Sequence, residues 1–165
     1  MEAKIFFVVL TCIVLLYSCE KIIDVDYQEE DLTGEWRHTD IIPSGPYEIG
    51  YKYFDVVSTI SFETDAKYAL EIDYYGFKDE NPNEIIGSSK TLGNYQVRAD
   101  SVFIKSLQNT SWEKEFNPEP YTVLYEDAKS SGSRFEINDN ILTLYYISYP
   151  ADAPVQTQMS YERVD

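Results

Sequence analysis

The sequence predicts an all-β domain, either a barrel or a sandwich, on three observations. From Gly34 onward, eight or nine short runs alternate apolar and polar side chains, which is the pattern of half-buried strands. Aromatic residues make up 15% of the chain, with 15 Tyr and 8 Phe, and such residues favour pleated strands over helices. No segment of this region has the apolar spacing of a helix of three turns.

The length and charge of the chain limit its class. Its 165 residues suffice for one domain with a single core, and we expect a monomer. The formal net charge of −16 argues against nucleic acid and anionic membrane surfaces as direct partners, because both require fields of Lys and Arg. An acidic surface more often serves solubility, so the charge identifies no cationic partner.

Residues 1–18 have the pattern of a signal peptide. Lys4 precedes an almost entirely apolar run, residues 5–16, which is shorter than the ~20 residues of a membrane-spanning helix. The following Leu16-Tyr17-Ser18-Cys19 resembles a lipobox, although Tyr17 is larger than usual at its position. This resemblance implies cleavage before Cys19 and its diacylation, for example with palmitate, and two acyl chains anchor a protein stably in a membrane. The alternative is an ordinary cleaved signal in which Cys19 is incidental.

Residues 19–31 are predicted to be an acidic tether, followed by a folded domain over residues 32–165. Between residues 20 and 31 the chain carries six acids and one Lys, a composition typical of an extended, solvated segment. Its role would be to hold the domain away from the membrane. Alternatively, acidic residues soon after a lipidated Cys direct surface export, as in some lipoproteins that this chain resembles.

Gly34 and Trp36 open the folded domain. Gly34 permits a turn or a close approach of backbone, and Trp36 is large enough to plug one end of a barrel. The chain ends in an alternating run, residues 159–165, which reads as a last strand. If that strand pairs with the first, Arg163 would lie over the Trp36 ring in a cation–π contact.

The Gly34-x-Trp36 pair and Arg163 resemble the lipocalin-like barrel family, and in particular the small lipocalin-like lipoproteins of Gram-negative bacteria. The resemblance implies an antiparallel up-and-down barrel of about eight strands, with Trp36 and Arg163 closing one end. It also implies a small apolar or amphipathic ligand inside the barrel, and an outer-membrane lipoprotein of the cell envelope facing the periplasm or the surface. The alternative is an ordinary strand with a buried Trp.

The sequence of the first half of the domain predicts strands separated by residues that favour turns. Pro43-Ser44-Gly45-Pro46 ends the first strand, and Thr64-Asp65-Ala66 forms a tight turn. The clearest half-buried strand follows, with Tyr68, Leu70, Ile72 and Tyr74 on one face. Strands are expected within residues 37–42, 48–54, 56–62 and 68–74.

The second half continues the pattern. Residues 88–97 and 101–107 predict a hairpin, in which Gly93 indicates a bulge or bend. Residues 109–120 read as a long loop or a distorted strand. Residues 134–137 and 141–149 pair across Asn138-Asp139-Asn140, and 121–125 is a further strand.

Metal sites have little support in the sequence, and we expect no cofactor. Both cysteines, Cys12 and Cys19, precede the domain, and there is a single histidine, so Cys-based and His-rich metal centres are excluded there. An acidic loop makes calcium conceivable, but its spacing does not match an EF-hand and a solvated loop is the simpler interpretation. The oxygen donors of this loop are Asp79, Glu80, Asn81, Asn83 and Glu84.

An enzyme is not expected. Nucleophilic catalysis needs a nucleophile beside a base, and His38 is the only histidine. A lone His on a strand is more often hydrogen-bonded or exposed than catalytic. A glycosidase-like carboxylate pair is not excluded, but with 29 acids two neighbouring carboxylates mean little.

Clustered tyrosines are the candidate ligand or partner surface. They could line the interior or mouth of a barrel for an apolar ligand. They could instead form an exposed platform for a glycan or a partner protein, or simply pack in a β-core. The candidates are Tyr51, Tyr53, Tyr74, Tyr95, Tyr145 and Tyr146.

Overall fold

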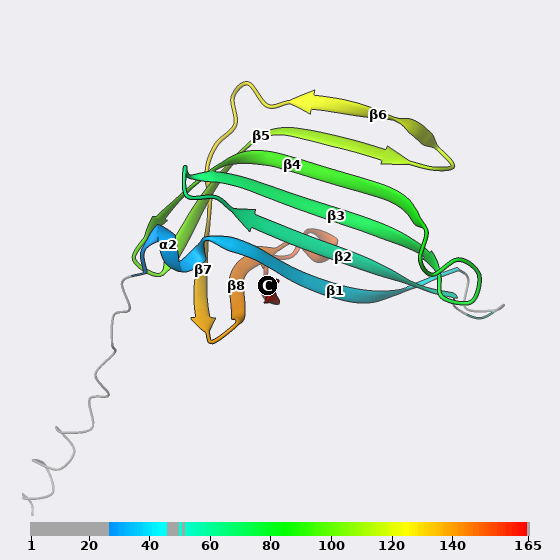
Figure 1. The fold of residues 1–165 in the computed structure, drawn as a ribbon, viewed down its shortest axis with the longest axis horizontal. Helices are drawn as coiled ribbons and strands as arrows, with labels where there is room; N and C mark the ends of the chain where they lie inside the picture. Colours follow the sequence, from blue (N-terminus) through cyan, green and yellow to red (C-terminus); the bar gives the residue numbers. More distant parts are fainter. Residues whose placement is uncertain (1–26, 46–49, 51, 165) are drawn as a thin grey trace, which may run out of the picture.

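The structure, a computed structural model, describes residues 27–45, 50 and 52–164. The predicted signal peptide, Cys19 and the first part of the predicted tether lie outside these residues. Nine antiparallel strands, a short helix and a 3₁₀ turn make up the described part (Figure 1). They are α2 (Glu29–Leu32), β1 (Gly34–Ser44), β2 (Lys52–Phe62), β3 (Lys67–Phe77), β4 (Ile85–Arg98), β5 (Ser101–Glu113), β6 (Asn117–Leu124), β7 (Ser131–Asn138), β8 (Ile141–Ser148), η2 (Pro150–Asp152) and β9 (Val155–Val164).

Eight of these strands form a closed antiparallel barrel. Each pairs with the next in the order β1-β2-β3-β4-β5-β7-β8-β9, and β9 returns to β1. Strand β6 pairs with β5 and lies outside this ring. Apart from this insertion, neighbours in the ring are neighbours in sequence. The prediction of an up-and-down barrel of about eight strands is therefore confirmed.

The barrel is tightly closed at one end only. The β1–β9 ladder covers three residue pairs, residues 35–37 with 162–164. The β5–β7 ladder covers four, residues 101–104 with 131–134. Beyond these short ladders, β1 to β6 continue together as a long sheet, while β7 and β8 turn away from it (Figure 1). We call the end that holds both ladders the closed end, and the opposite end of the long sheet the open end.

Large side chains fill the closed end. Trp36, Phe62 and Phe135 are almost completely buried, and the Phe62 and Tyr95 rings meet edge to face at a centroid distance of 4.9 Å. Such packing stabilises the barrel through buried apolar surface. The remaining buried members of this core are Leu32, Ile60, Tyr68, Val102, Leu142, Leu144 and Tyr161.

Residues 27–31 do not behave as a tether. Tyr27 packs on Phe135 with a ring-centroid distance of 4.7 Å, and its backbone N–H donates to the Ala99 carbonyl. The next residues form helix α2, whose last residue, Leu32, is fully buried. An extended, solvated segment was expected here from the acidic composition. That expectation is wrong for these residues, because Tyr27 and Leu32 supply apolar surface that covers the closed end.

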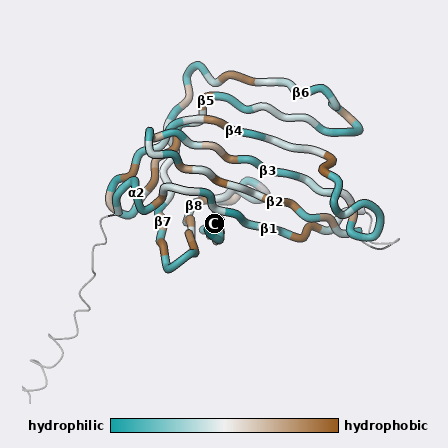
Figure 2. Tube along the Cα trace, in the orientation of Figure 1, coloured by the Kyte–Doolittle hydropathy of each residue, from teal (hydrophilic) through white to brown (hydrophobic). Residues whose placement is uncertain are grey.

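Turn and bulge residues occupy the positions that the sequence indicates. The β4–β5 ladder shifts register at Leu92 and Gly93, and a Cβ on Gly93 would lie 2.1 Å from the Lys105 carbonyl oxygen. The segment 109–120, expected as a loop or distorted strand, completes β5 and begins β6 in a hairpin. Exposed hydrophobic residues also occur on the long sheet, at Ile41 and Ile42 near the open end of β1 and at Val123 and Leu124 where β6 ends, away from the open end. Figure 2 shows hydrophobic stretches on both strands.

Candidate ligand-binding groove

The closed end is sealed by one tryptophan and one arginine. The Arg163 guanidinium carbon lies 4.1 Å from the centroid of the Trp36 ring. Its Nη1 donates to the Thr33 carbonyl at 2.9 Å and its Nη2 to the Asp31 carbonyl at 3.1 Å. The Trp36 indole N–H donates to the Leu32 carbonyl at 2.7 Å, so the buried ring leaves no unpaired donor.

Gly34 makes the seal possible. Its φ of 128° lies in a region that L side chains rarely adopt. A Cβ at Gly34 would stand 3.0 Å from Nη1 of Arg163. Gly34, Trp36 and Arg163, which the sequence predicted to close the barrel, therefore have a structural role at the closed end.

A groove of about 840 Å³ lies at the open end of the long sheet. This volume falls within the range of small-molecule pockets, although the groove is open to solvent rather than enclosed. Its walls come from β2, β3, β4, β5, β6 and the turns beside them. Six aromatic residues line it, namely Phe54, Tyr74, Phe77, Trp112, Phe116 and Tyr121.

The floor of the groove exists because β4 changes character along its length. At the closed end its inner face carries Tyr95, which is buried in the core. Towards the open end the same face carries Gly93, Thr91, Ser89 and Gly87, which occupy little space. The Asn109 amide on β5 donates to the hydroxyls of Ser89 at 2.9 Å and Thr91 at 3.0 Å. Of these residues, Gly87 and Ser89 line the groove, so its floor on β4 is small and polar.

Lysines at the rim of the groove are already paired. Lys52 forms an ion pair with Glu80, and its ammonium lies 5.2 Å from the centroid of the Phe77 ring. Lys114 forms an ion pair with Glu84. The Lys114 hydrogen bond, followed by one from the Asn81 amide, holds the pKa of the Glu84 carboxyl below its usual value.

Both ion pairs involve the acidic loop, residues 79–84, for which the sequence made calcium binding conceivable. Glu80 and Glu84 both face lysines across the groove rim. Among the described residues, no group of three or more His, Cys, Asp or Glu side chains is arranged to hold a metal ion. The geometry of this loop is that of an ion-paired surface turn.

The tyrosines singled out in the sequence do not gather in one place. Tyr74 lines the groove. Tyr53 is 47% exposed and lies outside the groove lining, and Tyr51 falls outside the described residues. Tyr95 is 4% exposed, donates to the Glu63 carbonyl at 3.0 Å, and has a pKa raised by burial. It belongs to the core and offers no surface to a ligand.

The two tyrosines of β8 lie on opposite faces of that strand. Tyr145 faces outward, where the Arg134 guanidinium carbon is 3.8 Å from its ring centroid and its hydroxyl donates to Glu136 at 2.9 Å. Tyr146 shares the inner face with Leu144 and lies outside the groove lining. Adjacent residues of a strand always separate in this way, because successive side chains alternate between faces.

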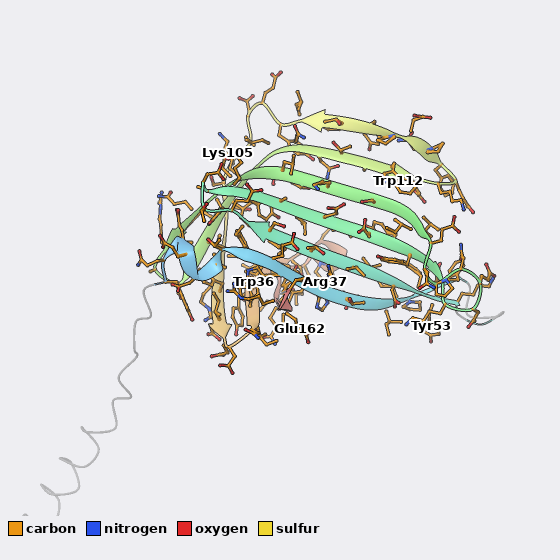
Figure 3. All side chains as sticks on the ribbon, in the orientation of Figure 1. Trp36, Arg37, Tyr53, Lys105, Trp112 and Glu162 are labelled. Atoms are coloured by element: carbon orange, nitrogen blue, oxygen red, sulfur yellow. The ribbon has the colours of Figure 1, made fainter. Side chains whose placement is uncertain are left out.

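Three groove residues escaped the sequence prediction, namely Trp112, Phe116 and Tyr121. They lie in or beside the 109–120 segment, which read as irregular. Figure 3 shows Trp36 near the closed end and Trp112 far from it on β5. The sequence did contain an indication of this groove. The inner face of β4 carries a row of Gly, Ser and Thr, and such small side chains leave space between the strands that pair with β4.

His38 has a structural place outside the groove. Its Nδ1 donates to the Ser160 carbonyl at 2.7 Å, and its Nε2 lies 3.1 Å from an Asp40 carboxylate oxygen. The β1–β9 ladder stops one residue earlier, at Arg37. The imidazole therefore bridges the two strands at the point where they separate.

Comparison with known proteins adds no assignment. No protein-family model matches the chain, and no curated protein matches it. Within the described residues, no helix has the length and apolar character needed to cross a membrane. The groove and the sequence are therefore the only indications of function.

Proposed function

We propose that this protein is a lipoprotein of the cell envelope whose lipocalin-like barrel binds a small amphipathic molecule. The observation that carries the proposal is the groove at the open end. Its six aromatic walls favour an apolar body, and Ser89, Ser111 and Asn81 in the lining favour polar groups on the same molecule. A binding role also agrees with the position of the only histidine, which bridges β1 and β9 away from the groove.

The ligand would occupy the open end rather than the barrel axis near Trp36. Core side chains fill the closed end, and the Trp36–Arg163 pair seals it. The open end offers the required volume because β4 carries small residues there. The resemblance to lipocalin-like proteins thus suggests a binding role, and the small residues of β4 support the open end as its location.

The proposed lipid anchor suits this orientation. Tyr27, the first described residue, packs at the closed end, whereas the groove lies at the opposite end of the long strands (Figure 1). Acyl chains on Cys19, a few residues earlier, would attach the closed end towards the membrane. The groove would then face away from the bilayer of the outer membrane and remain accessible.

A glycan is the second candidate occupant. Phe116 and Tyr121 on the β5–β6 hairpin are 80% and 54% exposed, and both belong to the groove lining. Exposed aromatic faces beside carboxylates and amides can stack on sugar rings while polar groups bind hydroxyls. This candidate differs from the first in using the rim of the groove instead of its floor.

Tryptophan fluorescence tests the binding role. The chain has two tryptophans, and only Trp112 lines the groove, because Trp36 is fully buried. The chain from Cys19 onward, produced without its leader and therefore without lipid, is titrated with amphipathic amines, alcohols and acids, with sterols and with oligosaccharides. A ligand should change the Trp112 emission and raise the Tm, with ~2.7 kcal/mol of stabilisation at 100 times its Kd.

The Trp112→Phe variant provides the control. It should lose the fluorescence response and keep the thermal stabilisation, because Trp36 remains shielded. A response to oligosaccharides alone would favour the glycan. If no class of compound raises the Tm, or if the Tm rises without any change in Trp112 emission, the groove is not the binding site.

A further inference from the structure

We infer that the ligand of this groove carries a positive charge, as an amine or a quaternary ammonium attached to an apolar body. This inference rests on the proposed function and names the chemical class of the occupant. Three observations support it. They are the charges around the groove, the position of Glu113, and the contact of the Lys52 ammonium with an aromatic ring and a carboxylate at the groove.

The groove has more negative charge than its own lysines neutralise. Glu113 and Glu115 line it, and within the described part of the chain neither carboxylate has an ion-pair partner. Lys114, between them in sequence, is engaged by Glu84. Two uncompensated carboxylates therefore border the aromatic walls. An apolar anion entering here would meet like charge, whereas a cation would be attracted.

Gly87 places Glu113 inside the groove. This glycine on β4 pairs with Tyr74 on one side and with Glu113 on the other. A Cβ at Gly87 would stand 3.7 Å from the Cγ of Glu113 and 3.3 Å from the Trp112 carbonyl oxygen. Tyr74 and Glu113 therefore flank Gly87 on the same face of the sheet, where the Glu113 side chain is exposed.

Lys52 shows what kind of group this surface accommodates. Its ammonium lies 5.2 Å from the Phe77 ring centroid and pairs with Glu80, and both of these partners line the groove. An aromatic face combined with a carboxylate is a recognised environment for an ammonium group. Tyr74 offers the same combination with Glu113, because both residues pair with Gly87 and so share one face of the sheet, and among the described residues no ion pair engages Glu113.

The overall charge of the protein acts in the same direction. With a formal net charge of −16, the molecule generates a negative potential that concentrates cations near its surface. This long-range term does not select a site by itself. It adds to the local preference at the groove, and both contributions weaken as salt concentration rises.

The test uses three probes with one body and different charge, namely 4-phenylbutylamine, 4-phenylbutanol and 4-phenylbutanoate. Their binding to the chain from Cys19 onward is measured by Trp112 emission and by calorimetry. The amine should bind about fivefold more tightly than the alcohol, the gain expected of solvent-exposed ion pairs, and the acid most weakly. The advantage of the amine should shrink at high salt.

A double variant and a matched control assign the effect to the groove. In E113Q/E115Q the amine should bind no better than the alcohol, because Gln keeps the shape of Glu but removes its charge. The control E126Q/D127N removes two exposed carboxylates outside the lining and should preserve the preference for the amine.

The outcomes separate this inference from the proposed function. Equal binding of all three probes at the groove, unaffected by E113Q/E115Q, would reject the charge preference and retain a binding groove. Loss of the preference in the control variant as well would assign it to overall charge and also reject the inference. Failure of every probe to bind in calorimetry would reject both.

Discussion

Arg163 on the last strand lies directly opposite Trp36 on the first, with its guanidinium carbon 4.1 Å from the ring centroid. The same guanidinium donates to the carbonyls of Thr33 and Asp31. One side chain therefore joins β9, β1 and the segment that leads from α2 into the barrel. Because the β1–β9 ladder has only three residue pairs, this contact carries much of the closure.

Replacing Trp36 should destabilise the fold strongly. We expect Trp36→Ala to lower the free energy of unfolding by ~3–5 kcal/mol, since a fully buried ring is removed from the core. Urea denaturation followed by circular dichroism measures the change. The control Trp112→Ala, at the open groove, should cost clearly less. A loss below about 1 kcal/mol for Trp36→Ala would contradict its role as the plug of the closed end.

Arg163 should prove irreplaceable by lysine. Arg163→Met leaves the Thr33 and Asp31 carbonyls without their donor, and we expect a loss of ~2–3 kcal/mol in the same assay. Arg163→Lys should recover only part of this loss, because one ammonium cannot reproduce a planar fork that donates to two carbonyls and covers a ring. Full recovery by lysine would show that charge alone matters at this position.

Tyr27 should contribute to stability although it precedes the barrel. Its ring packs on Phe135 and its hydroxyl accepts a hydrogen bond from the Ile137 N–H at 3.2 Å. We expect Tyr27→Ala to cost ~2–3 kcal/mol. The exposed Glu30→Ala in α2 is the matched control and should change stability by less than about 0.5 kcal/mol. Equal effects of the two variants would support a solvated tether instead.

Stability should fall in alkali, and Tyr161 should contribute to the fall. Burial, followed by the charges of Tyr146 and Asp40, raises the pKa of Tyr161 from 10.0 to about 12. A pKa raised in the folded state means that this stabilisation is complete below about pH 10 and is lost as pH rises towards 12.

The variant Tyr161→Phe isolates this effect. It should change stability by less than about 1 kcal/mol at pH 7, because the hydroxyl donates only to the Met159 sulfur. Between pH 10 and 12 its stability should decline less steeply than that of the wild type, by up to about 1.4 kcal/mol per pH unit. Identical pH profiles from urea denaturation would contradict the assignment.

The lipid anchor can be tested by metabolic labelling. Cells expressing the full-length protein are supplied with labelled palmitate, and the protein is recovered and counted. Cys19→Ala should abolish incorporation, because Cys19 is the proposed acylated residue, whereas Cys12→Ala should retain it. Incorporation into Cys19→Ala as strong as into the wild type would reject the lipoprotein assignment.

Much of the barrel could be predicted because its signals are local. Alternation on β3 follows from the period of a strand, and the β4–β5 and β7–β8 hairpins follow from turn residues at 98–100 and 138–140. The bulge at Gly93 was indicated by a glycine within a strand. The 109–120 segment was read less well, since Pro118 and Pro120 interrupt its pattern while β5 still supports an edge strand there.

The sequence by itself predicted an all-β fold and most of its strands, because these depend on side-chain period and turn chemistry. The up-and-down order and the contact of Trp36 with Arg163 were implied by the resemblance to lipocalin-like proteins. Only the tertiary structure decided where space remains. It buried Tyr95, turned Tyr145 outward, folded Tyr27 onto the core and brought Tyr74, Trp112 and Tyr121 together. These outcomes depend on where the β1–β9 and β5–β7 ladders stop, and that is set by register among strands distant in sequence.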